Sequence, residues 1–244
     1  LLKVLFQGPA SSSGTDSVSH AIFWNVRLPR VILAIVVGAS LAVAGVVMQG
    51  VFRNPLAEPA TVGVSGGAAV GAVIAITLGL SRITLGVQVF AVIGGTLATA
   101  IVYGLSRVVG KSDIVTLILT GIAINALSGA LIGLAVFIAD DDQIRTVTFW
   151  SLGSLGLATW RAVAMVLPLA IVGIALSTKF SRTLDLMALG DRSAEHVGVP
   201  VERVRLQTIA IVGLLASSAV AATGIIAFVG LIVPHILRLV LGPK

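Results

Sequence analysis

The sequence predicts an all-α membrane protein, a polytopic helical bundle with about seven spans. Of its 244 residues, 57% are hydrophobic and 11% are charged, and the mean hydropathy is +1.10. A soluble domain carries about 25% charged residues, so an ordinary soluble enzyme and a disordered chain are excluded. Uncharged runs of about 20 residues, enough to cross about 30 Å of hydrocarbon, recur along the chain. No aspartate or glutamate falls inside a long apolar run, so an internal proton or ion relay is not expected.

The first 14 residues differ in character from the rest. Leu2–Pro9 resembles a viral protease recognition site, and Ala10–Gly14 has the composition of a flexible linker. We expect residues 1–14 to be the remnant of a tag and linker, and residues 15–244 to form the transmembrane domain.

Seven spans follow in order, each predicted from an apolar run. The fifth run is short and contains Pro168. The last run is too long for one span and is expected to break near Thr223-Gly224. The runs are Val31–Val51, Val62–Leu80, Ile83–Leu105, Ile114–Ile138, Ala162–Thr178 and the divided run Leu206–Leu241.

Positive charge predicts the orientation, because cytoplasmic loops carry the excess of Lys and Arg. With the N-terminal flank outside, the inner loops and C-terminus hold ten such residues and the outer segments hold five. The N-terminus is therefore expected outside and the C-terminus inside. The net charge of +6 fits these basic loops, and no nucleic-acid partner is expected because no basic cluster interleaves with aromatics.

Two pairs of glycines are spaced for close helix packing. Gly67 and Gly71 lie on one helix face, as do Gly129 and Gly133. Small residues let helix backbones approach where no hydrophobic force separates helix from lipid. We expect both pairs to serve ordinary packing within the bundle.

Two polar stretches lie next to predicted spans. Arg27 and Arg30, three residues apart on the outer side, can present together on one turn. They either reach lipid phosphates or dock an acidic partner from outside. On the inner side, the prolines of Asn54–Pro59 stop a helix, and Asn54 and Glu58 then lie at the membrane boundary. Irregular backbone is tolerated there only if protein covers it or it lines a cavity, so this turn either is a plain loop or lines a pathway.

The inner segment between Lys179 and Arg205 is too structured for a linker and too short for a domain. It is expected to form two short helices broken at Gly190 and Gly198, with a surface that docks another protein. His196 has no second ligand at metal spacing and the chain has no cysteine, so no metal site is expected. No phosphate-binding Gly-x-x-x-x-Gly-Lys-Ser/Thr loop is present, so any ATP would be bound by another subunit.

Several of these motifs together resemble a known family. The chain from about Arg27 to Pro243 is similar to the permease subunit of type II ATP-binding-cassette importers, the iron-siderophore, haem and vitamin B12 uptake family. The motifs occur in the family's order: Arg27-Leu-Pro-Arg30, Val46-Val-Met-Gln49, Asn54-Pro-Leu-Ala-Glu-Pro59, Gly63-Val-Ser-Gly66, Trp150-Ser-Leu-Gly153, Ala188-Leu-Gly-Asp191 with Gly198, and Gly230-Leu-Ile-Val-Pro-His-Ile-Leu-Arg238.

The resemblance implies roles for individual residues. Arg27 and Arg30 match arginines that dock the periplasmic binding protein, and Asn54 and Leu56 match the cytoplasmic gate. The span 114–138 matches a helix that lines the pathway, where Thr116, Thr120, Asn125 and Ser128 supply weakly polar groups or interhelical hydrogen bonds. Residues 182–203 match the coupling segment that contacts the ATPase subunit, through Ala188, Leu189, Gly190, Asp191, Ala194, His196 and Gly198.

The resemblance also implies partners and location. Such permeases act as homodimers in the bacterial inner membrane, with cytoplasmic ATP-binding subunits that hold ATP and Mg²⁺, and with a periplasmic substrate-binding protein. The chain itself is expected to hold no cofactor and to be no enzyme. Family members have ten spans, so this chain is expected to lack the first and the last two.

Two other classes stay open at this stage. A seven-span receptor-like protein fits the outline, although a retinal protein would need a lysine in residues 225–241 and none is there. A secondary transporter would be expected to carry intramembrane carboxylates.

Overall fold

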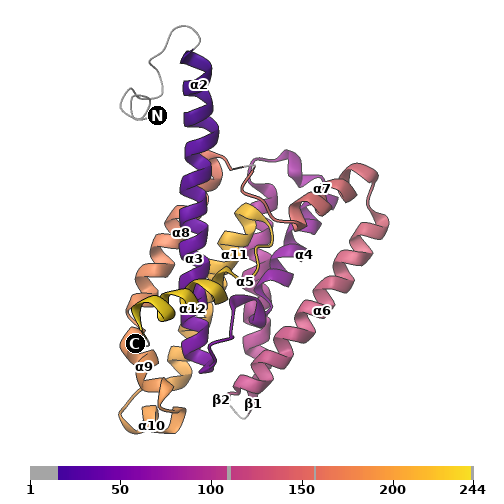
Figure 1. The fold of residues 1–244 in the computed structure, drawn as a ribbon. Helices are drawn as coiled ribbons and strands as arrows, with labels where there is room; N and C mark the ends of the chain where they lie inside the picture. Colours follow the sequence, from indigo (N-terminus) through magenta and orange to yellow (C-terminus); the bar gives the residue numbers. More distant parts are fainter. Residues whose placement is uncertain (1–15, 109–110, 157, 243–244) are drawn as a thin grey trace.

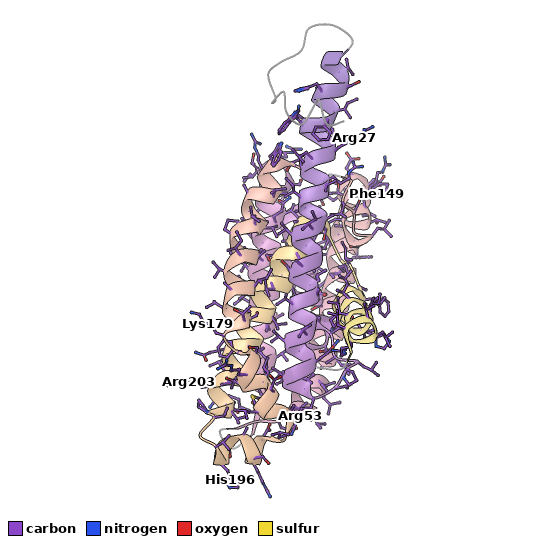
Figure 2. The ribbon with its side chains drawn as sticks, turned by 60° about the vertical axis from the view of Figure 1, so that its left-hand side comes forward. Arg27, Arg53, Phe149, Lys179, His196 and Arg203 are labelled. Carbon is purple, nitrogen blue, oxygen red and sulfur yellow. The ribbon has the colours of Figure 1, made fainter. Side chains whose placement is uncertain are left out.

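The long apolar helices run side by side along one axis, with the N-terminal helix extending beyond them at one end (Figure 1). A computed structural model describes residues 16–108, 111–156 and 158–242. The predicted tag and linker, residues 1–14, lie outside the described residues. We call the end that carries Arg27 the outer end and the end that carries His196 the inner end, following the orientation that the charges predict (Figure 2).

The order of elements confirms the all-α prediction, with the addition of one small hairpin whose two strands have two residues each. The elements are α2 (Asp16–Ile22), the π-helix η1 (Phe23–Arg27), α3 (Leu28–Phe52), the 3₁₀ turn η2 (Pro59–Val62), α4 (Val64–Thr77), the 3₁₀ turn η3 (Leu80–Arg82), α5 (Gly86–Leu105), β1 (Arg107–Val108), β2 (Lys111–Ser112), α6 (Ile114–Ile138), α7 (Asp141–Ser151), α8 (Trp160–Thr178), α9 (Ser181–Ala188), α10 (Asp191–His196), α11 (Val201–Thr223) and α12 (Val229–Leu241).

Five described helices are long and apolar enough to span a membrane. They are Val18–Phe52, which joins α2, η1 and α3, together with α5, α6, α8 and α11. Pro29 has no N–H to donate to the carbonyl of residue 25, and the turn that precedes it is the π-helix η1. α8 continues through Pro168, and α11 ends at Thr223 before Gly224, where the break was predicted.

The other two predicted spans are corrected, because α4 and α12 are too short to cross a membrane as helices. They have 14 and 13 residues, about 20 Å at 1.5 Å per residue. Pro59 and the left-handed Gly63 (φ 77°) keep the backbone from forming an α-helix until α4 begins. Before α12, residues 224–228 are likewise not helical, and Gly224 (φ 74°) and Phe228 (φ 68°) have positive φ angles. Each of these spans is therefore a composite of irregular backbone and a short helix.

The two irregular stretches meet inside the bundle, which satisfies the need to keep such backbone away from lipid. A Cβ on Gly230 would lie 2.9 Å from Pro59 Cδ and 2.9 Å from the carbonyl of Leu41. On the facing helix, a Cβ on Gly45 would lie 1.8 Å from the carbonyl oxygen of Gly230. α12 therefore lies across α3 in direct backbone contact (Figure 1).

The glycine prediction is confirmed for one pair and wrong for the other within this chain. A Cβ on Gly67 would lie 2.3 Å from the Cβ of Ala98, and one on Gly71 would lie 2.1 Å from the carbonyl oxygen of Phe90, so both pack α4 against α5. A Cβ on Gly129 or Gly133 would meet nothing within 4 Å among the described residues. These two glycines lie on the open side of α6, whose most apolar stretch is 11% buried.

The main hydrophobic core forms where α3, α8 and α11 pack together. α11 is the most enclosed of the long helices, with 72% of its most apolar stretch buried. Fully buried side chains from the three helices meet there, among them Leu33, Met48, Val166, Ile209 and Leu215. α11 is thus the central helix of the bundle, and the inner polar segments begin at its inner end.

Candidate functional site

The predicted gate residues lie on a tight turn at the inner end of α3. Arg53 ends the helix in the left-handed conformation (φ 50°). The side-chain oxygen of Asn54 then accepts a hydrogen bond of 2.9 Å from the backbone N–H of Leu56. Because Asn54 closes the turn in this way, Leu56 points outward, and its side chain is 70% exposed.

Glu58 lies deeper than the boundary position predicted for it. It lines a small cavity with Pro59 and Gly230, and a Cβ on Gly230 would lie 3.4 Å from Gly45 of α3. Gly45 precedes the last residue of α3 by about two helical turns. The stretch Asn54–Pro59 therefore climbs back into the bundle from its exposed inner end.

The predicted pathway residues of α6 are divided between different tasks. Thr116 takes part in the N-terminal cap of its own helix, because it donates its N–H and its hydroxyl to Oδ2 of the capping residue Asp113, each at 2.8 Å. The Nδ2 of Asn125 donates to the carbonyl of Ala60 at 3.0 Å, which ties α6 to the irregular stretch before α4. Thr120 is half-buried and Ser128 is buried. Interhelical bonding thus accounts for Asn125, while the open face of α6 remains free to line a pathway.

The hydrogen bonds from Thr116 also alter the acidity of Asp113. They hold the pKa of this carboxyl below its ordinary value of 3.8, because they favour its charged form. Asp113 therefore caps α6 as a carboxylate over the whole neutral pH range.

The two outer arginines are both exposed but make different contacts. Arg27 ends the π-helix η1. Arg30 lies one turn further on, and its Nη2 donates to the carbonyl of Gly156 at 3.0 Å. A second bond, from Trp160 Nε1 to the carbonyl of Trp24 at 2.9 Å, holds the start of α8 to the same part of the N-terminal helix. Arg30 therefore holds the outer loop before α8, whereas Arg27 lies on the N-terminal helix near the outer end (Figure 2).

The predicted coupling segment forms two short helices, as expected. α9 and α10 are separated at Gly190 (φ 110°), and Gly198 (φ 90°) follows α10. Ala194 is buried, Asp191 and Gly190 are half-buried, and Ala188, Leu189, His196 and Gly198 are exposed. His196 lies at the tip of the inner end, with Arg203 above it on the same segment (Figure 2).

A polar cluster that the sequence analysis missed lies directly above α10. The side chain of Arg205 is 2% exposed, and its Nη2 donates to Asp191 Oδ2 at 2.8 Å. Its Nη1 donates to the carbonyl and hydroxyl of Ser112 at 2.9 and 3.0 Å. Glu202 accepts from the hydroxyls of Ser112 (2.8 Å) and Tyr103 (2.6 Å). The signal was available, because Arg205 is a charge at the very start of an apolar run with a glutamate three residues before it.

Comparison with known proteins gives a consistent result. The FecCD transport family matches residues 2–244. The hemin transport system permease protein HmuU of Yersinia pestis is 42% identical, covering 99% of this chain and 73% of the relative. The cobalamin import system permease protein BtuC of Halobacterium salinarum is 41% identical, covering 94% of this chain and 62% of the relative. The chain thus spans between about three-fifths and three-quarters of the length of these relatives.

The fold agrees with a solved structure. A metal-chelate type ABC transporter in an inward-facing conformation superimposes with a TM-score of 0.87 and 30% sequence identity, covering 99% of this chain and 79% of the other. The family match over nearly the whole chain decides against the receptor-like and secondary-transporter alternatives. The chain belongs to the FecCD transport family, as a multi-pass membrane permease, the translocation subunit rather than an enzyme, of an ABC transporter.

Proposed function

We propose that this permease carries a haem, a ferric siderophore or a cobalamin from a periplasmic binding protein to the cytoplasm, across a bacterial inner membrane. The names of the relatives support this substrate class, since they include hemin and cobalamin permeases, and the solved relative is of the metal-chelate type. All three substrates are bulky, and the open, largely apolar face of α6 offers them a wall rather than a tight pocket.

One observation supports ATP-driven action most directly. Leu189 and Val197, on either side of α10, are 73% and 66% exposed although they lie at the polar inner end. We infer that these two exposed apolar side chains in a polar segment contribute to a contact with another protein. The arrangement of α9 and α10 around them gives the surface that an ATP-binding subunit, holding ATP and Mg²⁺, would cover.

The remaining candidate residues fit one sequence of events. Arg27 and Arg30 receive an acidic surface of the binding protein at the outer end. The face of α6 lines a pathway between this chain and a second copy. ATP binding moves the coupling segment 182–203, and that motion opens or closes the turn that carries Asn54 and Leu56.

The test uses the full-length permease co-expressed with its ATP-binding subunits. Burying a Leu or Val contributes about 1.5–3 kcal/mol, so the double variant Leu189→Ser/Val197→Ser should reduce ATPase co-purification at least about tenfold. The matched control is Leu78→Ser, because Leu78 is 66% exposed at the opposite end of the bundle. It should leave co-purification unchanged.

Transport is then measured with the purified complex in proteoliposomes. ATP-dependent uptake of hemin, cobalamin or a ferric siderophore, supplied on its binding protein, is expected for one of the three classes. Retention of the ATPase by the double variant, or no ATP-dependent uptake of any of the three, would contradict the proposed function.

A further inference from the structure

The buried guanidinium of Arg205 joins three separate inner segments. Its Nη2 holds Asp191 at the start of α10, and its Nη1 holds the carbonyl of Ser112 at the end of the β1–β2 hairpin between α5 and α6. Arg205 itself belongs to α11, the most enclosed long helix of the bundle. One side chain therefore connects the short helix at the inner tip with the hairpin that joins α5 and α6.

A charge this deeply buried needs a partner at all times. Removing one member of a buried ion pair costs several kcal/mol, because the other charge is left uncompensated. If α10 moved alone, Asp191 would leave Arg205 and incur this cost. Motion at α10 is therefore opposed unless another acceptor takes its place.

Glu202 is placed to be that acceptor. Its Oε2 lies 3.8 Å from Arg205 Nη1, too long for a hydrogen bond but within reach of a small shift. Its position is fixed by three donors, namely the hydroxyl of Tyr103 and the N–H and hydroxyl of Ser112. Arg205 also has an unused donor, because its buried Nε lacks a hydrogen-bond partner in the described part of the chain.

Asp191 has a second basic neighbour besides Arg205. Its Oδ1 lies 3.8 Å from Nη2 of Arg53, in a pair of side chains that are 35% and 37% exposed. An exposed pair of this length contributes little, about 0–1 kcal/mol. Release from Arg205 would leave Asp191 in contact with solvent, where its charge is hydrated.

We propose that Arg205 is a two-position relay, which exchanges Asp191 for Glu202 when the ATP-binding subunits pull on α10. In the first position it holds α10 to α11 and the hairpin. In the second it binds Glu202 more closely, and the shift is transmitted through Ser112 and Tyr103 to α6 and α5. Arg205 is thus a positioning residue, and its role rests on the proposed contact between α10 and an ATPase.

Two variants should act in opposite directions. Glu202→Gln keeps an amide oxygen that can accept from Ser112 and an NH₂ that can donate to the hydroxyl oxygen of Tyr103, but it offers no charge to Arg205, so α10 should stay held. Asp191→Asn weakens the first position, so α10 should be released without ATP. Lys179→Gln is the matched control, because it removes an exposed positive charge at the inner end, outside the coupling segment 182–203.

The experiment measures α10 directly in the assembled importer. The chain has no cysteine, so Arg192→Cys on α10 and Val115→Cys on α6 can carry two spin labels in one permease copy per complex. The labelled but otherwise unchanged protein should change its distance distribution on ATP binding. Glu202→Gln should keep the resting distribution and lower uptake per ATP about fivefold, whereas Asp191→Asn should show the released distribution without ATP. Lys179→Gln should match the unchanged protein.

The outcomes separate this proposal from the proposed function. Cross-linking from His196→Cys should capture an ATP-binding subunit, and failure to do so would overturn the role of α10 in coupling. Capture together with an unchanged response of Glu202→Gln, or with the same change in Asp191→Asn and Glu202→Gln, would overturn the relay alone. If the network were merely structural, Asp191→Asn and Glu202→Gln would shift the distance distribution of α10 and the uptake per ATP in the same direction.

Discussion

Arg27 and Arg30 show how two identical side chains, one turn apart, come to do different work. The sequence predicts that the pair either reaches lipid phosphates or docks an acidic partner, and both side chains are exposed. The fold then gives Arg30 a second task, because its guanidinium holds the carbonyl of Gly156 in the outer loop. A charge-assisted bond of this kind is stronger than a neutral one, so the loop depends on Arg30 and not on Arg27.

We predict that charge reversal separates the two tasks. Arg27→Glu should weaken association with the binding protein about tenfold at low salt, with a smaller loss at high salt because ions screen exposed charges. Arg30→Glu should cause a similar loss and also lower the thermal midpoint of the permease. Surface plasmon resonance across salt concentrations and thermal unfolding in detergent measure the two effects. Unchanged docking by both variants would rule out the pair as a docking site.

Asp113 gives a pH-dependent prediction, because its folded pKa is lowered. A carboxylate of this kind contributes stability above its unfolded pKa and loses it as the pH falls through the lowered value. Because Asn keeps the cap but not the charge, Asp113→Asn should lower the thermal midpoint by roughly 2–4 °C at pH 7. The difference from the unchanged protein should begin to shrink below about pH 4 and disappear only when the pH is below the lowered pKa of Asp113. Asp185→Asn, at an exposed site in α9, should show neither effect. A difference that is constant with pH would contradict the capping role.

Among the elements, the short helix α12 explains why two of the motifs occur together. Gln49 of α3 donates from Nε2 to the carbonyl of Gly230 at 3.4 Å and accepts from Arg238 at 2.7 Å. The motif at Val46–Gln49 and the motif at Gly230–Arg238, far apart in sequence, are thus two halves of one contact. Their function in the fold is to seat α12 and the irregular stretch before it against α3.

We predict that Gly45 tolerates no side chain. In Gly45→Ala the new methyl group would meet the backbone of Gly230, and overpacking of this kind costs about 1–3 kcal/mol. Gly38→Ala on the same helix meets nothing within 4 Å and should be neutral or gain up to about 1 kcal/mol from helix propensity. Unfolding of both variants in mild detergent provides the comparison. Equal stability of the two would show that α12 is not seated on Gly45.

At the scale of the whole molecule, α6 is the least buried of the five long apolar helices that the structure describes, with 11% of its most apolar stretch covered. Large apolar side chains cover it, including Leu127 and Leu134, which are 54% and 62% exposed. The prediction that Gly129 and Gly133 pack inside the bundle was wrong because no described element reaches them. The proposed second copy would face this side across the pathway.

Cross-linking tests that arrangement without removing native cysteines, since the chain has none. In the assembled importer, Leu127→Cys or Leu134→Cys should give a permease dimer with a short bismaleimide. Ile171→Cys, 58% exposed on α8, should give no dimer. Dimer from α8 and none from α6 would place the second copy on the opposite side.

The sequence by itself determined the membrane environment, the helical class, the order of the apolar runs and the glycine breaks at Gly190, Gly198 and Gly224. These follow from composition and local backbone preference, which act over a few residues. Tertiary structure alone decided that α4 and α12 are half-length helices, that Arg30 holds Gly156, and that Arg205, Ser112 and Asp191 meet. Those outcomes depend on which distant backbone groups come within hydrogen-bonding distance. The sequence of an apolar run does not indicate which distant groups it will contact, because lipid and a packed helix favour the same side chains.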